Sequence, residues 1–243
     1  AMENDAERAS VSHDASRQLV FAAGLLPRGV VAPEWIQFGM GSFFETPMES
    51  PWATVAAPSN TYVPQFNELI KKKKLEATPL DTLKKVVTDT YFRRPGLGVE
   101  PEVAQRKART TAWSLTYYLA QKRLDGLLRY FQELAKMPRD LELSDEVLLG
   151  CFARAFDCVD ANKKVDPQKL QALAQDWLSY SRVVLLESEE VLQEIRKHFK
   201  EMNTKPENAQ DNSGTAPGDR GGPGGRPGGP GAGGRPGGPG GGS

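Results

Sequence analysis

Apolar residues recur every three or four positions along most of the first 203 residues, the spacing that lines one face of an α-helix. The pattern predicts a helix that ends at the lysine run 71–74 and further helices over residues 12–26, 34–46, 78–92, 102–121, 124–136, 144–156, 166–178 and 188–202. Apolar and polar residues alternate over 52–55, where we expect a short strand inside a proline-rich segment. The sequence therefore predicts a mainly α fold.

Several of these helices carry recognisable start signals. Thr78, Pro79 and Asp81 have the order of an N-cap, a first helical residue and an acid near the positive end of the helix dipole. Ser144 is in position to cap its helix, and Pro167 opens a later one. These signals agree with the boundaries that the apolar spacing predicts.

The chain changes character after residue 203. From Thr204 onward it is polar and then rich in glycine and proline, with almost no apolar side chain to bury. Such a segment cannot offset the conformational entropy that is lost on ordering. We expect a helical domain over residues 1–203 and a disordered tail over 204–243, whose arginines could make weak contacts with nucleic acid or another polyanion: Arg220, Arg226 and Arg235.

The composition narrows the function classes. The 31 Lys and Arg residues balance 31 Asp and Glu residues, whereas dedicated nucleic-acid binders usually carry a basic excess. No stretch approaches the roughly 20 apolar residues that a membrane-spanning helix needs, and we recognise no signal peptide at the start. We expect a fragment or a processed product, and the terminus does not give the compartment. Cys151 and Cys158 are interpreted as two buried thiols on one helix face.

The segment His13-Asp14-Ala15-Ser16-Arg17 has the spacing of a zinc-peptidase helix. In such a helix, histidines at i and i+4 reach one tetrahedral metal from the same face. A glutamate next to the first histidine acts as the general base. In this chain an aspartate stands at the place of that glutamate, and an arginine stands at the place of the second histidine.

Downstream segments add to this comparison. Residues 33–45 follow a Pro-x-Trp-x-x-x-Gly order that runs into two aromatics and a glutamate: Pro33, Trp35, Gly39, Met40, Gly41, Phe43, Phe44 and Glu45. The stretches KARTTAWSLTYYLAQKRLDGLLRYFQEL, CFARAFD and LAQDWLSY follow. Over about residues 8–182 the chain resembles an uncharacterised family of the peptidase MA-like (gluzincin) clan of planctomycete-type bacteria. The resemblance implies a zincin-like C-terminal helical subdomain, with a metal-helix remnant crossed by a second helix. It also implies a bacterial protein, exported if an N-terminal signal has been removed.

The metal ligands of that clan are carried over one by one. The first histidine corresponds to His13, the second to Arg17 and the glutamate ligand to Phe38, while the general base corresponds to Asp14. Arginine is a permanent cation that repels zinc, and phenylalanine has no lone pair to donate. The resemblance therefore implies an inactive pseudo-metallopeptidase without a cofactor, which binds or scaffolds an unknown protein or peptide. We expect Arg17 to pair with Asp14 or Glu45, and Phe38 to fill the vacated metal pocket.

Two alternatives stay open. In the first, the chain is an active zinc metallopeptidase whose remodelled site draws on His13, Asp14, Glu34 and Glu45, and its proteolysis is sensitive to chelators. In the second, it is a helical structural module unrelated to zincins, without the crossed helices at 12–26 and 34–46. Zincins usually place a β-sheet subdomain before the metal helix, and too few residues precede His13 here to form one. Peptide binding at such an edge strand is therefore not expected.

Overall fold

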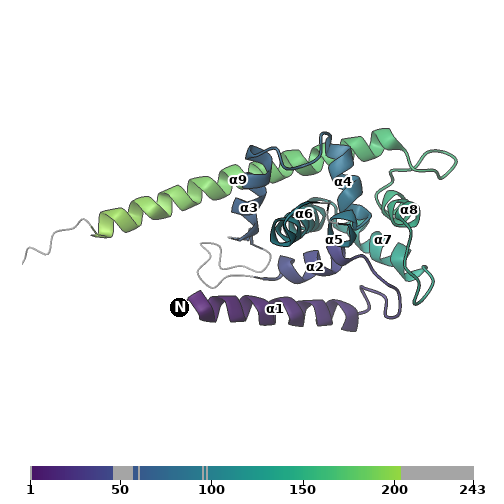
Figure 1. Ribbon diagram of the computed structural model, residues 1–243, viewed down its shortest axis with the longest axis horizontal. Helices are drawn as coiled ribbons and strands as arrows, with labels where there is room; N and C mark the ends of the chain where they lie inside the picture. Colours follow the sequence, from purple (N-terminus) through teal and green to yellow (C-terminus); the bar gives the residue numbers. More distant parts are fainter. Residues whose placement is uncertain (1, 46–56, 60, 95, 97, 204–243) are drawn as a thin grey trace, which may run out of the picture. The chain divides into compact units, whose positions relative to one another are not determined.

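The structure, a computed structural model, describes residues 2–45, 57–59, 61–94, 96 and 98–203. These ranges form nine α-helices (Figure 1): α1 (Met2–Ala22), α2 (Glu34–Phe43), α3 (Tyr62–Lys71), α4 (Pro79–Val87), α5 (Thr90–Arg93), α6 (Pro101–Lys122), α7 (Leu124–Ala135), α8 (Asp145–Ala155) and α9 (Pro167–Asn203). Within the described ranges there is no strand, only an isolated antiparallel bridge between Val159 and Val165. The predicted mainly α fold is confirmed, and the strand expected at 52–55 and the tail at 204–243 lie outside the described residues.

Helix α2 lies between α1 and the long helix α6 (Figure 1). Its side chains Trp35 and Ile36 are completely buried. The indole of Trp35 stacks on Tyr130 of α7 at a centroid distance of 5.6 Å and meets Phe152 of α8 edge-on at 6.3 Å. Large aromatic side chains that are buried together supply much of the hydrophobic free energy of a core. Helix α2 is thus both a core element and the element that faces α1.

Two glycines let α2 approach both of its neighbours closely. A Cβ atom on Gly39 would lie 2.0 Å from Thr116 Oγ1 and 3.1 Å from the carbonyl oxygen of Ala112, both on α6. A Cβ atom on Gly41 would lie 2.7 Å from the imidazole of His13 on α1. Protein interiors are close-packed, so a side chain at either position would push the helices apart.

Asp89 interrupts the helix that the sequence predicts over 78–92. Its backbone is left-handed, with φ of 61°, and separates α4 from α5. Its buried carboxylate accepts hydrogen bonds from the backbone N–H groups of Glu34, at 2.8 Å, and Trp35, at 2.9 Å. Burial raises the pKa of Asp89, and these two hydrogen bonds oppose the rise. The predicted helix is broken because Asp89 caps the first turn of α2, a function that a helix-interior residue could not perform.

Helix α9 is continuous where the sequence analysis placed two helices, at 166–178 and 188–202. The residues between these ranges include no glycine or proline, so nothing in the backbone stops the helix. A buried hydrogen-bond chain holds this part of α9 to α6: Trp177 Nε1 donates to Ser114 Oγ at 3.1 Å, and Ser114 and Ser181 share a hydrogen bond of 2.9 Å. No described helix is long and apolar enough to cross a membrane.

Glu76 joins the loop after α3 to three helices. Its carboxylate lies 2.9 Å from Lys85 Nζ of α4 and 3.1 Å from Lys107 Nζ of α6, and it accepts a hydrogen bond of 2.9 Å from the hydroxyl of Tyr91. Burial acts to raise the pKa of Glu76, but the hydrogen bonds from these three groups lower it to about 2.

The approach of α2 to α6 can be tested with Gly39→Ala. We expect a loss of about 2–3 kcal/mol in the free energy of unfolding, because the new methyl group overlaps Thr116. Thr116→Ala removes a buried hydroxyl without a hydrogen-bond partner among the described residues, and should restore part of that loss in the double variant. Urea denaturation of the parent chain, the two single variants and the double variant measures the coupling energy between Gly39 and Thr116. Strictly additive losses would contradict the contact.

The ion pairs of Glu76 predict a particular pH dependence. Because the folded-state pKa lies below the ordinary value of 4.5, the stabilisation is complete above pH 4.5 and is lost as the pH falls towards 2. Glu76→Gln should cost about 1–2 kcal/mol at neutral pH, and the difference from the parent chain should shrink as the pH falls from 4.5 towards 2. Urea denaturation at a series of pH values checks this. A difference that stays constant with pH would contradict it.

Candidate functional site

The contact between α1 and α2 brings His13 to the end of α2. His13 Nδ1 lies 2.5 Å from Glu45 Oε1, and both side chains are only 15 % exposed. The absent side chain of Gly41 leaves the space that the imidazole occupies. The hydrogen bond with Glu45 orients the ring and links α1 to the residue pair that follows α2. The sequence analysis placed both residues in a rebuilt site but did not pair them.

Arg17 lies one helical turn after His13 and contacts the beginning of α2. Its Nη2 atom donates to Gln37 Oε1 at 2.6 Å and lies 3.7 Å from Glu34 Oε2. Gln37 in turn donates to the carbonyl oxygen of Ala32 at 2.7 Å. The expected pairing of Arg17 with Asp14 or Glu45 is therefore wrong: the antiparallel course of α1 and α2 sets Arg17 against Glu34 and Gln37. The cation still links the two helices.

Phe38 is packed among aromatic rings next to His13. Its ring centroid lies 5.0 Å from that of His13, 5.9 Å from Tyr62 and 6.1 Å from Phe92. The guanidinium of Arg109 lies over the same ring at 5.5 Å, a cation–π geometry. Phe38 is 8 % exposed, so it fills this position with apolar volume. Burial raises the pKa of Tyr62, and the nearby carboxylate of Glu45 adds to the rise.

The expected alternative ligands do not converge on one point. His13 and Glu45 are in contact, but Asp14 is exposed and Glu34 lies beside the cation of Arg17. In the described part of the chain, no group of three or more His, Cys, Asp or Glu side chains could hold a metal ion. The residues present at this position therefore do not fit a tetrahedral zinc ion, which needs three protein ligands and an open fourth place in a catalytic site.

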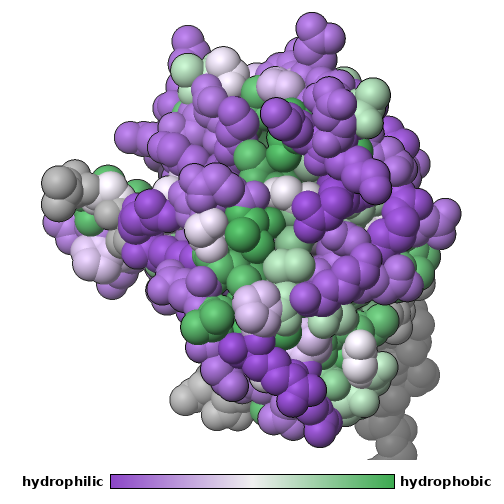
Figure 2. All heavy atoms as spheres, turned by 90° about the vertical axis from the view of Figure 1, so that its right-hand side faces the viewer, coloured by the Kyte–Doolittle hydropathy of each residue, from purple (hydrophilic) through white to green (hydrophobic). Residues whose placement is uncertain are grey.

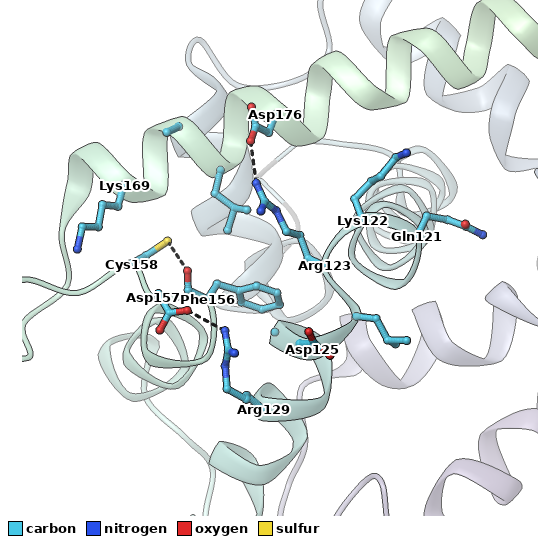
Figure 3. A pocket seen from close by; sticks show the side chains of 14 residues that line it. Gln121, Lys122, Arg123, Asp125, Arg129, Phe156, Asp157, Cys158, Lys169 and Asp176 are labelled. Carbon is cyan, nitrogen blue, oxygen red and sulfur yellow. Dashed lines mark hydrogen bonds and ion pairs between the residues drawn. The ribbon is translucent and has the colours of Figure 1, made fainter.

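Away from these residues, a cavity lies at the junction of α6 and α7 with the start of α9 (Figure 3). We call it the larger cavity. Its volume is about 600 Å³. Arg123 donates to Asp176 at 3.1 Å and Arg129 donates to Asp157 at 2.8 Å, so its arginines are already paired (Figure 3). Figure 2 shows this end of the molecule, where hydrophobic side chains form a strip between hydrophilic ones.

The thiol in this cavity is not an activated nucleophile. Cys158 is 3 % exposed, and its Sγ donates to the carbonyl oxygen of Phe156 at 3.4 Å. Burial raises the pKa of Cys158 to about 11, so the thiol stays protonated at neutral pH. Cys151 and Cys158 are both buried and free, as expected, but Cys158 follows the end of α8 and does not share its face.

Sequence reasoning missed this cavity and its ion pairs. The paired residues are separated by 53 positions for Arg123 and Asp176 and by 28 for Arg129 and Asp157. No local spacing indicates such pairs, because they depend on where α7 and α9 lie in space.

A comparison with protein families gives one match that extends over more than half of the chain. The family model described as "Protein of unknown function (DUF1570)" matches residues 7–140, and the chain belongs to this family. The matched range includes α2 and most of α1, but the description names no activity, so the resemblance to gluzincins stays a prediction. Searches of curated proteins and of solved structures gave no match.

The pairing of His13 with Glu45 can be measured by a double-mutant cycle. His13→Ala and Glu45→Ala should each destabilise the fold, and their effects should be non-additive by about 1 kcal/mol, because each removes the same partly buried hydrogen bond. Asp14→Ala is the matched control: its side chain is exposed, so a change of less than about 0.5 kcal/mol is expected. Additive effects would show that the pair contributes nothing.

Proposed function

We propose that this member of the DUF1570 family is a catalytically inactive, zincin-like helical domain that serves as a binding or scaffolding module. In this proposal α1 and α2 are the remnants of a metal helix and its crossing helix. The three former ligand positions are His13, Arg17 and Phe38. The chain keeps the helix pair for its packing and has lost the metal chemistry.

The observation that carries the proposal is the proximity of these positions despite their changed chemistry. His13 and Phe38 are in ring contact at 5.0 Å, and Arg17 follows His13 by one turn on the same side of α1. This is the arrangement that two ligands from one helix and one from a second would need. Instead, the side chain of His13 makes a hydrogen bond to Glu45, that of Arg17 donates to Gln37, and that of Phe38 belongs to an aromatic cluster.

The remaining groups are poor candidates for hydrolysis. A general base must lie within hydrogen-bond reach of the water that it activates, and Asp14 is exposed and one methylene shorter than a glutamate. A permanent cation at Arg17 also opposes a second cation in the same place. A protein of this kind acts through what it binds, so its partner is expected to be a protein or peptide.

The proposal predicts the zinc content of two chains. The parent chain, dialysed against trace zinc and analysed by elemental analysis, should contain none. The triple variant Asp14→Glu, Arg17→His and Phe38→Glu restores two imidazoles at i and i+4 and a carboxylate from α2, and should take up zinc near one equivalent. Circular dichroism of both chains verifies that the variant is folded.

The outcomes separate the competing functions. Stoichiometric zinc in the parent chain, together with proteolysis that a chelator stops, would replace the proposal with an active peptidase whose ligands include His13 and Glu45. A folded triple variant that takes up no zinc would instead favour a helical module unrelated to zincins. Arg17→His alone is the matched control, because two imidazoles without the third ligand should bind zinc much more weakly.

A further inference from the structure

A shallow apolar groove of about 330 Å³ lies on the surface between the loop after α3, the start of α4 and one face of α9. Its apolar walls are Leu69, Ile70, Leu75, Ala77, Pro79 and Leu178. Several of these side chains are only partly buried, although they pack against the core. We call this surface the basic-rimmed groove, because its lining also includes Lys73 and Arg182.

The charges of this groove are unbalanced. Lys73 and Arg182 are exposed, and neither has an ion-pair partner in the part of the chain that the structure describes. The one acid in the lining, Glu76, is already held by Lys85 and Lys107. An incoming anion therefore meets two unpaired cations beside an apolar surface. The arginines of the larger cavity differ, since each already faces an aspartate.

The backbone fixes the place of Lys73. Its φ is 52°, the left-handed region that favours glycine, at the second residue after α3 ends at Lys71. The N–H of Lys73 donates to the carbonyl oxygen of Ile70 at 3.1 Å, and that of Lys74 donates to Leu69 at 2.9 Å. A lysine in this backbone region costs conformational energy that a glycine would not. These hydrogen bonds fix the backbone of Lys73 at the edge of the groove.

We propose that the basic-rimmed groove docks an acidic peptide segment of a partner protein. Apolar side chains of that segment insert between Leu75, Ala77 and Leu178, and its carboxylates pair with Lys73 and Arg182. Apolar anchors spaced along one helix face, with charged residues beside them, suit a groove of this shape. The inference deepens the proposed binding function by naming the docking surface and the partner's chemistry, but it does not depend on the fate of the metal site.

The probe is a fluorescein-labelled peptide of about 12 residues, with leucines at i, i+3, i+4 and i+7 and glutamates elsewhere. Its matched counterpart carries lysines in place of the glutamates. Fluorescence anisotropy with the full chain should show binding of the acidic peptide only. Lys73→Glu and Arg182→Glu should each weaken it about three- to tenfold, and added salt should weaken it as well. Ala77→Trp should block the groove.

Two controls separate a docking role from a structural one. Lys164→Glu makes the same change of charge on an exposed loop outside the groove and should leave the affinity unchanged. Lys73→Gly should raise the melting temperature, because glycine adopts the left-handed backbone conformation without strain. The same variant should still bind the acidic peptide more weakly. A lysine with a purely structural role would not give these opposite changes.

Three results would overturn the inference. The first is no binding of the acidic peptide at about 1 mM, a Kd that corresponds to a binding free energy of only about −4 kcal/mol. The others are equal binding of both peptides, and an equal loss of peptide affinity in Lys164→Glu and Arg182→Glu. The zinc measurement is independent of all three. A chain without zinc that fails to bind the peptide would leave the inactive-domain proposal standing and remove the groove. A chain that contains zinc and binds the peptide would overturn the inactive-domain proposal and leave the groove standing.

Discussion

The close approach of α2 to its two neighbours decides where both the core and the candidate metal positions lie. With no side chain at Gly39, α2 rests against Thr116 and the backbone of α6, and with none at Gly41 it leaves room for the imidazole of His13. The carboxylate of Asp89 then satisfies the first N–H groups of α2 from a different part of the chain. Because all three contacts act on one ten-residue helix, a shift of α2 would move the core residue Trp35 and the aromatic side chain of Phe38 together.

The same constraint bears on the proposed ancestry of α1 and α2. A metal ion that bridges two helices contributes to their association, and its loss must be offset by other contacts. Here Arg17 bonds to Gln37, His13 bonds to Glu45, and Phe38 packs between His13 and Tyr62. Each contact crosses from α1 or α3 to α2 or to the residue pair after it. If α1 and α2 derive from a metal site, as proposed, these several weaker contacts hold the two helices together without an ion.

Local signals in the sequence predicted most of the helices and their caps, because those depend on neighbours a few residues apart. The N-caps of Thr78 and Ser144 accept the expected backbone hydrogen bonds, from Asp81 and Val147. The break at Asp89 could not be predicted in this way, since its cause is the first turn of α2, 54 and 55 positions away. The partners of Arg17 were missed for a related reason: the register of two antiparallel helices is set by Gly41 and the core, not by the spacing on α1.

The balance of charge distinguishes the surfaces on which a partner could act. In the cavity beside α7 both arginines already face aspartates, in exposed pairs that are worth only about 0–1 kcal/mol. The two lysines of the same lining also have contacts, since Lys122 lies over the ring of Tyr180 and Lys169 donates to the carbonyl oxygen of Val159. At the basic-rimmed groove no described acid competes for Lys73 or Arg182, and the apolar walls beside them give burial energy that a flat charged surface lacks. In a chain whose charges sum to zero, this local excess is informative because its cations lack described partners. Recognition at this groove would leave α1 and α2 free of any role in binding, which accords with the proposal that this helix pair contributes only packing.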